Sequence, residues 1–262
     1  MELKPDTLAN AHERMAHIKS HAHRGFFTNY FRQEMVGGKI LVAAGNRTIL
    51  LMNDEHDFFR LYFFTSDLAD LGISLHQTRY PGDAVIGYLT KSADNKVIRA
   101  IEEGGFHPIA TYRRMETYRL PRQQPNPSLE YAVPADADQL HADLFQAFNK
   151  YTDHLPTRSR LLEYIKNQQV IVRRQLGKII GAVCFRLHGL KVNYNYIYSL
   201  SGHGLDFLQL QNNFYGVMNQ RAIRAGFLWI NEANHRLAVL YRATGWQFDG
   251  LQDYFYFRGM RP

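Results

Sequence analysis

The stretch Asn234-His-Arg-Leu-Ala-Val-Leu-Tyr-Arg-Ala-Thr-Gly-Trp246 is the part of this chain that decides how the rest is interpreted. It predicts a short helix with one apolar face, a Tyr seven residues after the Asn, and a Gly-aromatic pair beyond the helix. A tyrosine hydroxyl at such a place can give a proton to a leaving group. The alternative is that Leu237, Leu240 and Tyr241 pack the helix onto a sheet.

The residues around this stretch predict a regular succession of elements. Thr157 is a suitable N-cap for one helix, and the turn at Leu176-Gly-Lys178 joins two strands in a hairpin. Strands are expected over 129–133, 170–175, 179–187, 192–199, 227–230 and 253–258, and helices over 134–150, 158–167, 207–225 and 234–244. The last strand is expected to close the sheet.

The first half of the chain repeats much of this order. The segment Leu120–Ser128, with three prolines in polar company, is the clearest linker. Before it, strands are expected over 39–44, 48–52, 58–64, 84–89 and 111–119, with a helix over 95–102. Between Phe64 and Ala84 only a short segment, 66–71, and a loop are expected. Two domains follow, residues 1–122 and 123–262.

The element order of residues 129–258, together with Asn234–Trp246, resembles that of the GNAT-type N-acyltransferases. The resemblance implies an α/β fold of two GNAT-like mixed-sheet domains in tandem, a degenerate one at 1–122 and an acyltransferase domain at 123–262. It further implies transfer of an acetyl or other acyl group from acetyl-CoA (acyl-CoA) to a primary amine of a small molecule or peptide. An amino acid, a polyamine, an aminosugar and a peptide N-terminus are all compatible acceptors.

The resemblance also implies roles for individual residues. Tyr241 protonates the departing thiolate, and Asn234 contacts the cofactor arm. His203 is the nearest titratable group with a suitable pKa for a base, because no carboxylate lies between Lys191 and Leu205. The residues expected to bind the acyl-CoA through the strand end, the loop and the last helix are Ile197, Ser199, Leu200, Gly202, Gly204 and Asn234.

The loop after the strand expected over 192–199 departs from the family pattern in one respect. Two other functions therefore remain possible. Ser199 stands where the family has Arg or Gln before its Gly-x-Gly turn, here Gly202 and Gly204. Transferases of the Fem type also have two GNAT-like halves, lack that loop, and take an aminoacyl group from tRNA, which would suit a basic chain. Their strand before a long helix is similar to Tyr194-Asn-Tyr-Ile-Tyr198, whose three tyrosines are expected on one strand face. A non-catalytic GNAT-like binding module is the remaining alternative.

Composition and charge limit the classes of protein to which this chain can belong. The formal net charge is +7, which can attract CoA phosphates, tRNA or another anion. The single Cys184 lies in an apolar run and excludes an internal disulfide. No apolar run is long enough to span a membrane, and the N-terminus lacks the layout of a signal peptide, so a cytoplasmic protein is expected.

The histidines near the N-terminus suggest a metal site only superficially. His17 and His21 have the spacing that places two imidazoles on one helix face, with His12 and His23 nearby. No carboxylate or cysteine stands at a convincing third position. We therefore expect no metal, and a polar helix that turns Met15 and Ile18 inward.

Overall fold

A computed structural model of the chain describes residues 2–20, 22, 25–29, 40–55, 57–91, 96–126, 129–201 and 204–259. Packing divides these residues into two compact units. Unit 1 consists of Met1–Thr111 and Leu251–Pro262, and unit 2 of Tyr112–Gly250. The predicted halves, 1–122 and 123–262, follow chain order and do not coincide with these units. Among the described helices, none combines the length and apolarity that a membrane span requires.

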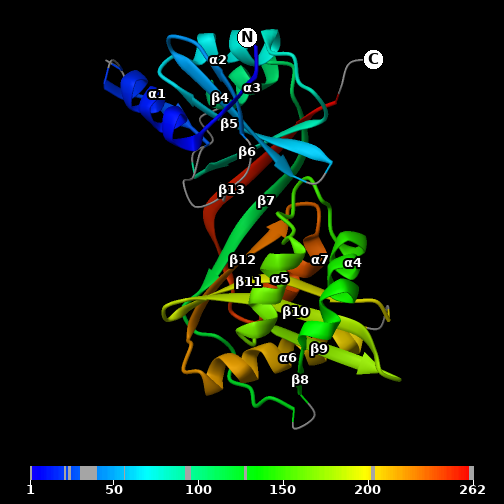
Figure 1. Ribbon diagram of the computed structural model, residues 1–262. Coiled ribbons are helices and arrows are strands. Elements are labelled where there is room, and N and C mark those ends of the chain that lie inside the picture. Colours follow the sequence, from blue (N-terminus) through cyan, green and yellow to red (C-terminus); the bar gives the residue numbers. More distant parts are fainter. Residues whose placement is uncertain are drawn as a thin grey trace. The chain divides into compact units, whose positions relative to one another are not determined.

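Unit 1 is a mixed sheet with helices on both faces (Figure 1). Its elements are β1 (Lys4–Asp6), α1 (Leu8–Ser20), β2 (Phe27–Thr28), β3 (Ile40–Ala44), β4 (Thr48–Glu55), β5 (Phe58–Thr65), α2 (Leu68–Gln77), β6 (Ala84–Thr90) and α3 (Lys96–Glu103). The strand order is β1-β3-β4-β5-β6-β13, with β2 on β5. Helix α1 buries Met15 and Ile18 on one face, as predicted, while α2 and α3 cover the other.

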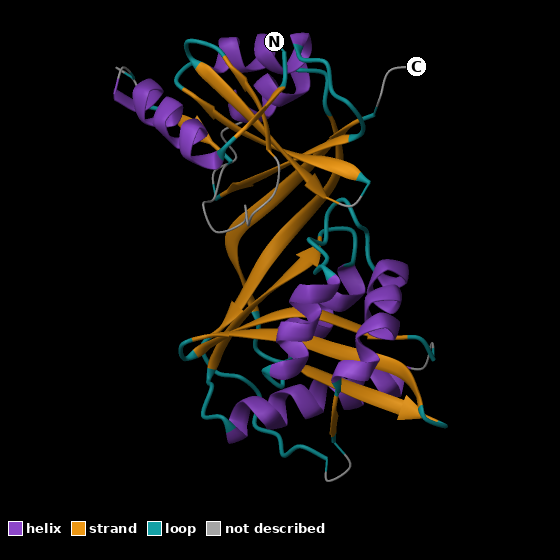
Figure 2. Ribbon diagram, in the orientation of Figure 1, coloured by secondary structure: helices purple, strands orange, loops and turns teal. Residues whose placement is uncertain are grey.

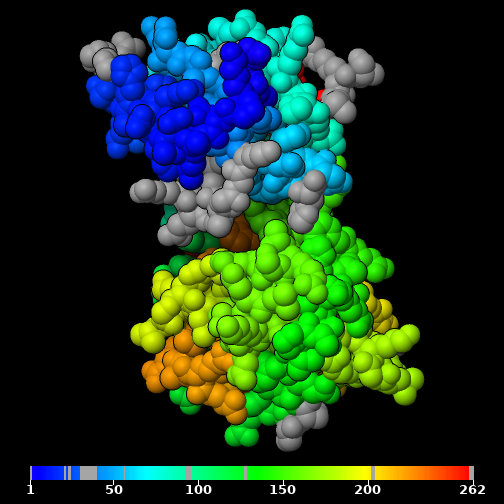
Figure 3. All heavy atoms as spheres, viewed as in Figure 1, coloured from blue at the N-terminus to red at the C-terminus, as the bar shows by residue number. Residues whose placement is uncertain are grey.

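Unit 2 has the same layered construction (Figure 2). Its elements are β8 (Glu130–Tyr131), the 3-10 turn η1 (Pro134–Asp136), α4 (Ala137–Ala147), α5 (Arg158–Lys166), β9 (Val170–Gln175), β10 (Lys178–His188), β11 (Lys191–Ser199), α6 (Gly204–Gln220), β12 (Ala225–Asn231) and α7 (His235–Ala243). The strand order is β7-β12-β11-β10-β9-β8. Helices α4 and α5 cover one face, the green surface in Figure 3, and α6 and α7 the other. These two sheets confirm the predicted α/β class.

Two long strands, β7 (His107–Thr117) and β13 (Gln247–Arg258), exchange the closing positions of the two sheets. Residues 112–117 of β7 pair with β12 in unit 2. Residues 252–258 of β13 pair with β6 in unit 1. The expectation that the last strand closes the second sheet is therefore wrong. Alternating apolar residues specify a strand, but they do not specify which of two similar sheet edges it joins.

Unit 1 also contains a helix where only a short segment was expected. Helix α2 has ten residues, and Asp67 caps it by accepting hydrogen bonds from the backbone N–H groups of Ala69 and Asp70. Gly72 lies inside it, which lowers intrinsic helix propensity and hides the helix from sequence analysis. A Cβ at Gly72 would lie 3.3 Å from the carbonyl oxygen of Ala100 on α3, so the glycine lets the two helices approach.

The proline-rich segment after β7 packs against α6. The side-chain amide of Asn219 donates to the carbonyl oxygen of Pro121 over 2.9 Å. The backbone N–H of Asn126 donates to the side-chain oxygen of Asn213 over 3.0 Å. A Cβ on Gly216 would lie 2.3 Å from the backbone nitrogen of Pro125. The linker is therefore fastened to unit 2, and Gly216 is the residue that allows this contact.

Replacing Gly216 with alanine is expected to destabilise unit 2, although alanine is the better helix former. Overpacking costs about 1–3 kcal/mol, against a gain of roughly 1 kcal/mol in helix propensity. Thermal unfolding measures the balance, with Asn212→Ala at an exposed position of the same helix as the control. A Gly216→Ala protein that melts at or above the wild-type temperature would show that the linker yields easily.

Candidate functional site

The strands β11 and β12 diverge halfway along their length. They pair in parallel over 191–194 with 225–228. Beyond this, residues 229–231 of β12 pair with β7, and the rest of β11 pairs with β10. The facing edges of β11 and β12 therefore hold peptide groups with no partner strand between them. Such diverging strands at the centre of a sheet offer a place for an extended ligand.

A β-bulge at Asn195 coincides with the divergence. Tyr194 lies opposite Phe185 and Tyr196 lies opposite Cys184, so Asn195 is the extra residue. The Tyr194 ring consequently stacks on Phe214 of α6 at 4.1 Å, whereas Tyr196 and Tyr198 pack under α4 and α5. The expectation that the three tyrosines share one face is wrong, because an added residue reverses the alternation of a strand.

Two buried polar atoms at this point, the Oδ1 atoms of Asn193 and Asn195, have no hydrogen-bond partner among the described residues. The Tyr194 hydroxyl is also buried, and it interacts with the Tyr241 hydroxyl. A buried polar group left unsatisfied costs about 1–3 kcal/mol. Sequence analysis did not single out the two asparagines, although polar residues inside a buried strand are the signal that marks them. Their placement makes the divergence of β11 and β12 a polar site inside the sheet.

Tyr241 lies on the α6 and α7 side of the same point. It is 2 % exposed, and its ring makes edge contacts with Tyr194 at 6.0 Å and Trp246 at 5.8 Å between centroids. Burial raises the pKa of the Tyr241 hydroxyl, which therefore keeps its proton at neutral pH. Tyr194 and Tyr241 thus place two protonated hydroxyl groups near the divergence.

The end of α7 explains why Gly and Trp follow Tyr241. The backbone N–H of Trp246 donates to the carbonyl oxygen of Tyr241, and that of Gly245 donates to Arg242. With Gly245 at φ +90°, these two bonds form a Schellman motif, which is usually accompanied by an apolar contact such as that between Tyr241 and Trp246. The spacing of this segment therefore has a structural cause as well as the predicted catalytic one.

Asn234 and the predicted donor-binding residues of β11 lie around this site. The Asn234 side chain caps α7 by accepting a hydrogen bond from the Leu237 N–H over 3.1 Å, and the residue is exposed. Ile197 and Ser199 lie on β11 beyond the bulge. The Leu200 N–H is already bonded to the carbonyl oxygen of Ile180 over 2.7 Å, so it is not available to a ligand.

The loop between β11 and α6 is only partly described. Gly202 and His203 lie outside the described residues, so their roles stay predictions. Gly204 is the first residue of α6, and a Cβ there would meet no other atom within 4 Å. Asp206 in the first turn forms an ion pair with Arg173 over 2.8 Å. Arg173 is thus the cation that the structure places beside this helix start.

A polar loop between α4 and α5 covers the opposite face of the divergence. The Tyr196 hydroxyl donates to the carbonyl oxygens of Asp153 and His154, over 3.1 and 2.7 Å. The Tyr112 hydroxyl of β7 lies 3.0 Å from the Thr152 hydroxyl. Because Tyr112 pairs with Asn231 of β12, the loop is bonded to β11 and to the strand that adjoins β12. Sequence analysis missed these residues, which meet only through folding.

Unit 1 lacks the corresponding hydroxyl. Its helix α3 ends in the same motif, with Phe106 N–H bonded to Ile101 and Gly105 N–H bonded to Glu102. Ile101 is therefore the counterpart of Tyr241. Counting seven residues from Asn95, as from Asn234 to Tyr241, leads instead to Glu102, because the segment 95–106 is one residue shorter than 234–246.

The diverging strands of unit 1 are bridged by the chain itself. Strands β5 and β6 pair only at 59–60 with 84–85. Beyond this, the buried Asn29 side chain donates to the carbonyl oxygens of Leu61 and Gly87, over 3.0 and 2.9 Å. It also accepts from the Phe63 N–H over 2.6 Å, and β2 pairs with the end of β5. The peptide groups that a ligand would use in unit 1 are therefore already occupied.

The remaining candidates for chemistry are weaker. Cys184 is fully buried as predicted, and burial raises the pKa of its thiol to about 12, so it is inert. Within the described ranges, no three His, Cys, Asp or Glu side chains gather closely enough to hold a metal. Of the N-terminal histidines, His21 and His23 lie outside those ranges.

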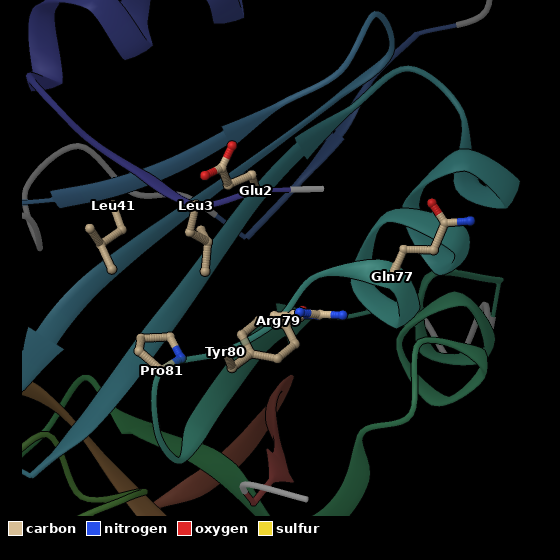
Figure 4. A pocket seen from close by; sticks show the side chains of 7 residues that line it. All are labelled: Glu2, Leu3, Leu41, Gln77, Arg79, Tyr80 and Pro81. Atoms are coloured by element: carbon tan, nitrogen blue, oxygen red, sulfur yellow. The ribbon is translucent and has the colours of Figure 1, made fainter.

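Three surface cavities belong to unit 1, whereas the predicted site residues belong to unit 2. One of about 650 Å³ lies between β1, β3 and the segment after α2, where Leu3, Leu41, Tyr80 and Pro81 form its apolar part and Glu2, Gln77 and Arg79 its polar part (Figure 4). Two smaller ones, about 450 and 270 Å³, adjoin β1 and α1. None of the three includes a predicted site residue.

Comparison with known proteins relates the whole chain to one fold. No family model and no curated protein matches the sequence. A GCN5-related N-acetyltransferase from Sphaerobacter thermophilus superposes with a TM-score of 0.58 at 16 % identity, covering 86 % of this chain and 81 % of its own. A GNAT-family acetyltransferase from Colwellia psychrerythraea gives 0.55 at 10 % identity, over 99 % and 100 %.

The tandem arrangement has its own counterpart. A tandem GNAT protein from the clavulanic acid biosynthesis pathway superposes with a TM-score of 0.52 at 12 % identity, covering 99 % of this chain and 98 % of its own. Two of these matches, the Colwellia psychrerythraea acetyltransferase and the tandem GNAT protein, cover nearly the whole chain and so both units. At such low identity they establish the fold and not the activity. The chain has the tandem fold of the GNAT N-acetyltransferases.

Proposed function

We propose that this protein is an N-acyltransferase that moves an acyl group from acyl-CoA, most simply acetyl-CoA, to a primary amine, and that unit 2 carries the reaction. The observation that carries the proposal is the divergence of β11 and β12, where the buried Oδ1 atoms of Asn193 and Asn195 lack partners among the described residues. The amides of a pantetheine arm and a thioester carbonyl are polar groups of the kind that would satisfy such a site.

The reaction requires four changes in bonding. The amine nitrogen loses a proton and attacks the thioester carbon, so that an N–C bond forms and the C–S bond breaks. The departing sulfur then accepts a proton. Tyr241, held protonated by burial, supplies a hydrogen bond or proton to that sulfur from the α6 and α7 side.

The donor would lie along the exposed edge of β11, toward the start of α6. Ile197 and Ser199 would contact its pantetheine, Gly202 and Gly204 its phosphates, and Asn234 the arm near α7. A helix N-terminus favours anions, and Arg173 lies beside this one, paired with Asp206. Because the Leu200 N–H is already bonded to Ile180, the predicted contact at Leu200 is confined to its other atoms.

Calorimetric titration with CoA and acetyl-CoA tests the proposal, with deacylated tRNA as a parallel ligand. Micromolar binding of acetyl-CoA, followed by acylation of at least one member of an amine panel, supports it. Binding of tRNA that weakens steeply with salt, without CoA binding, would instead favour the aminoacyl-tRNA-dependent alternative. No turnover with any donor would leave a binding module.

The structure predicts one donor molecule per chain, not two. Asn29 and β2 occupy the diverging edges of β5 and β6, and Ile101 replaces the hydroxyl of Tyr241 in unit 1. The stoichiometry of the acetyl-CoA titration measures this directly. In hydrogen exchange, the donor should protect β11 and the start of α6 but leave β5 unchanged. A stoichiometry of two would show that the segment at Asn29 gives way to ligand.

A further inference from the structure

The proposed reaction needs a base for the incoming ammonium group, and the predicted candidate, His203, lies outside the described residues. A base must lie on the acceptor side of the thioester, within reach of the diverging strands. Tyr241 and Tyr194 occupy the α6 and α7 face. The other face is covered by the loop between α4 and α5, which carries one carboxylate at the divergence, that of Asp153.

Hydrogen bonds within this loop and from the sheet fix its conformation. The Asn149 N–H donates to the Asp153 carboxylate over 2.8 Å, and the Asp153 N–H donates to the Asn149 carbonyl oxygen over 2.9 Å. Tyr196 ties the loop to β11 just beyond the bulge, and Tyr112 ties it to β7 next to the end of β12. His154 adopts φ +46°, a conformation that non-glycine residues keep only when their surroundings impose it.

The alternation of the strands places these groups on one face. Leu228 and Ile230 of β12 point into the core under α6 and α7, so Asn231 points to the opposite face, as does its partner Tyr112. Beyond the bulge, Tyr196 points to the same face from β11. Asp153 therefore lies between Tyr196 of β11 and Tyr112 of β7, the strand that pairs with β12, on the face of the sheet opposite Tyr241.

We infer that Asp153 is the catalytic base of the proposed reaction and that Tyr112 is its positioning residue. The inference rests on the proposed function. Asp153 takes one proton from the ammonium group, directly or through a water molecule, and passes it to solvent. The free amine attacks the thioester carbon between β11 and β12, the C–S bond breaks, and Tyr241 on the other face gives its proton to the departing sulfur. The nitrogen loses its second proton to water as the amide forms, and a proton from water restores the Tyr241 hydroxyl. Base and acid thus act from opposite sides of one sheet.

The electrostatic setting suits this role. Partial burial raises the pKa of the Asp153 carboxyl, opposed by hydrogen bonds from the Asn149 backbone and from Tyr112. A carboxylate with a raised pKa is a stronger base than an exposed one. The other titratable or charged groups around it are Tyr196 from β11 and, in the loop itself, His154 and Lys150, the last placed over the Tyr151 ring.

The test compares Asp153→Asn with Asp138→Asn, an exposed carboxylate on α4 that pairs with Arg158 and undergoes the same change of charge. Each variant is assayed for kcat/KM with the amine across pH, for acetyl-CoA binding, and for thermal unfolding. Asp153→Asn is expected to lower kcat/KM by about 10²–10⁴-fold, to lose the acidic limb of the pH profile, and to bind acetyl-CoA as the wild type does. Asp138→Asn is expected to change none of these.

Two further variants distinguish the role of Asp153 from those of Tyr112 and His203. Tyr112→Phe removes a hydrogen bond that lowers the pKa of Asp153, so the acidic limb should move to higher pH, which a purely structural residue would not cause. His203→Gln should leave that limb in place. If the wild type is active and Asp153→Asn is equally active, Asp153 is not the base. The same holds if the acidic limb disappears in His203→Gln instead. Either result leaves the proposed function in place. A wild type that acylates no amine overturns the proposed function itself.

Discussion

A chain that ends at Gly250 is expected to lose the folded structure of unit 1 while unit 2 stays intact. The truncation removes the part of β13 that pairs with β6, and with it the buried Phe255 and Tyr256. Burying one large apolar side chain contributes about 1.5–3 kcal/mol, against a total stability of roughly 5–15 kcal/mol for a domain. It also removes Arg258, whose guanidinium donates to the carbonyl oxygens of Leu75 and Gly104 over 2.7 and 2.8 Å.

Hydrogen exchange distinguishes the two units in this experiment. Amides of β6 and α3 should lose protection in the truncated chain, and those of β9 and β10 should keep it. A chain ending at Gly259 is the matched control, since it removes only residues beyond β13 and should retain full protection. Wild-type protection of β6 in the shorter chain would mean that unit 1 does not depend on the exchanged strand.

Replacing Tyr241 with phenylalanine is expected to lower kcat by roughly 10²-fold or more while the protein stays folded. General acid catalysis contributes about 10²–10⁴-fold, and the substitution removes only the hydroxyl. The ring contacts with Tyr194 and Trp246 that hold the end of α7 remain. Steady-state kinetics with acetyl-CoA and a competent amine measure the effect, and thermal unfolding checks the fold.

Tyr198→Phe is the control for that result. It removes another buried tyrosine hydroxyl from unit 2, one that donates to Asp143 on α4 over 3.0 Å, away from the face on which Tyr241 lies. Its kcat should match that of the wild type even if its melting temperature falls. Equal rates for Tyr241→Phe and the wild type would leave Tyr241 as a packing residue in the Schellman motif of α7.

The features that the sequence could predict are those determined by neighbouring residues. The helix at Asn234–Thr244, its end at Gly245, and the hairpin between β9 and β10 are specified by neighbouring residues, so the patterns predicted them. Gly72 hid helix α2, because a glycine lowers helix propensity wherever it stands. The order of elements was sufficient to suggest the tandem fold that the comparisons support.

What the sequence could not predict depends on contacts between distant segments. A bulge is one residue out of register with a neighbouring strand, so the reversal at Asn195 is invisible in the sequence of β11 alone. The meeting of Tyr112 with Thr152 joins residues forty positions apart. Of the predicted site, Tyr241 and the edge of β11 lie near each other at the divergence, whereas Asp153 could be recognised only once the α4–α5 loop was seen across it.

The exchange of β7 and β13 has a consequence for how this protein is made. A ribosome releases the chain from its N-terminus, at about 5–20 residues per second. Strand β6 is complete at Thr90, but its partner ends at Arg258, which is 168 residues later. For roughly 8–34 seconds the nascent chain therefore carries an open sheet edge at β6, until β13 covers it. Unit 2 can fold during that interval, because all of its residues precede Leu251. The second unit in the sequence is thus the first that can complete its fold.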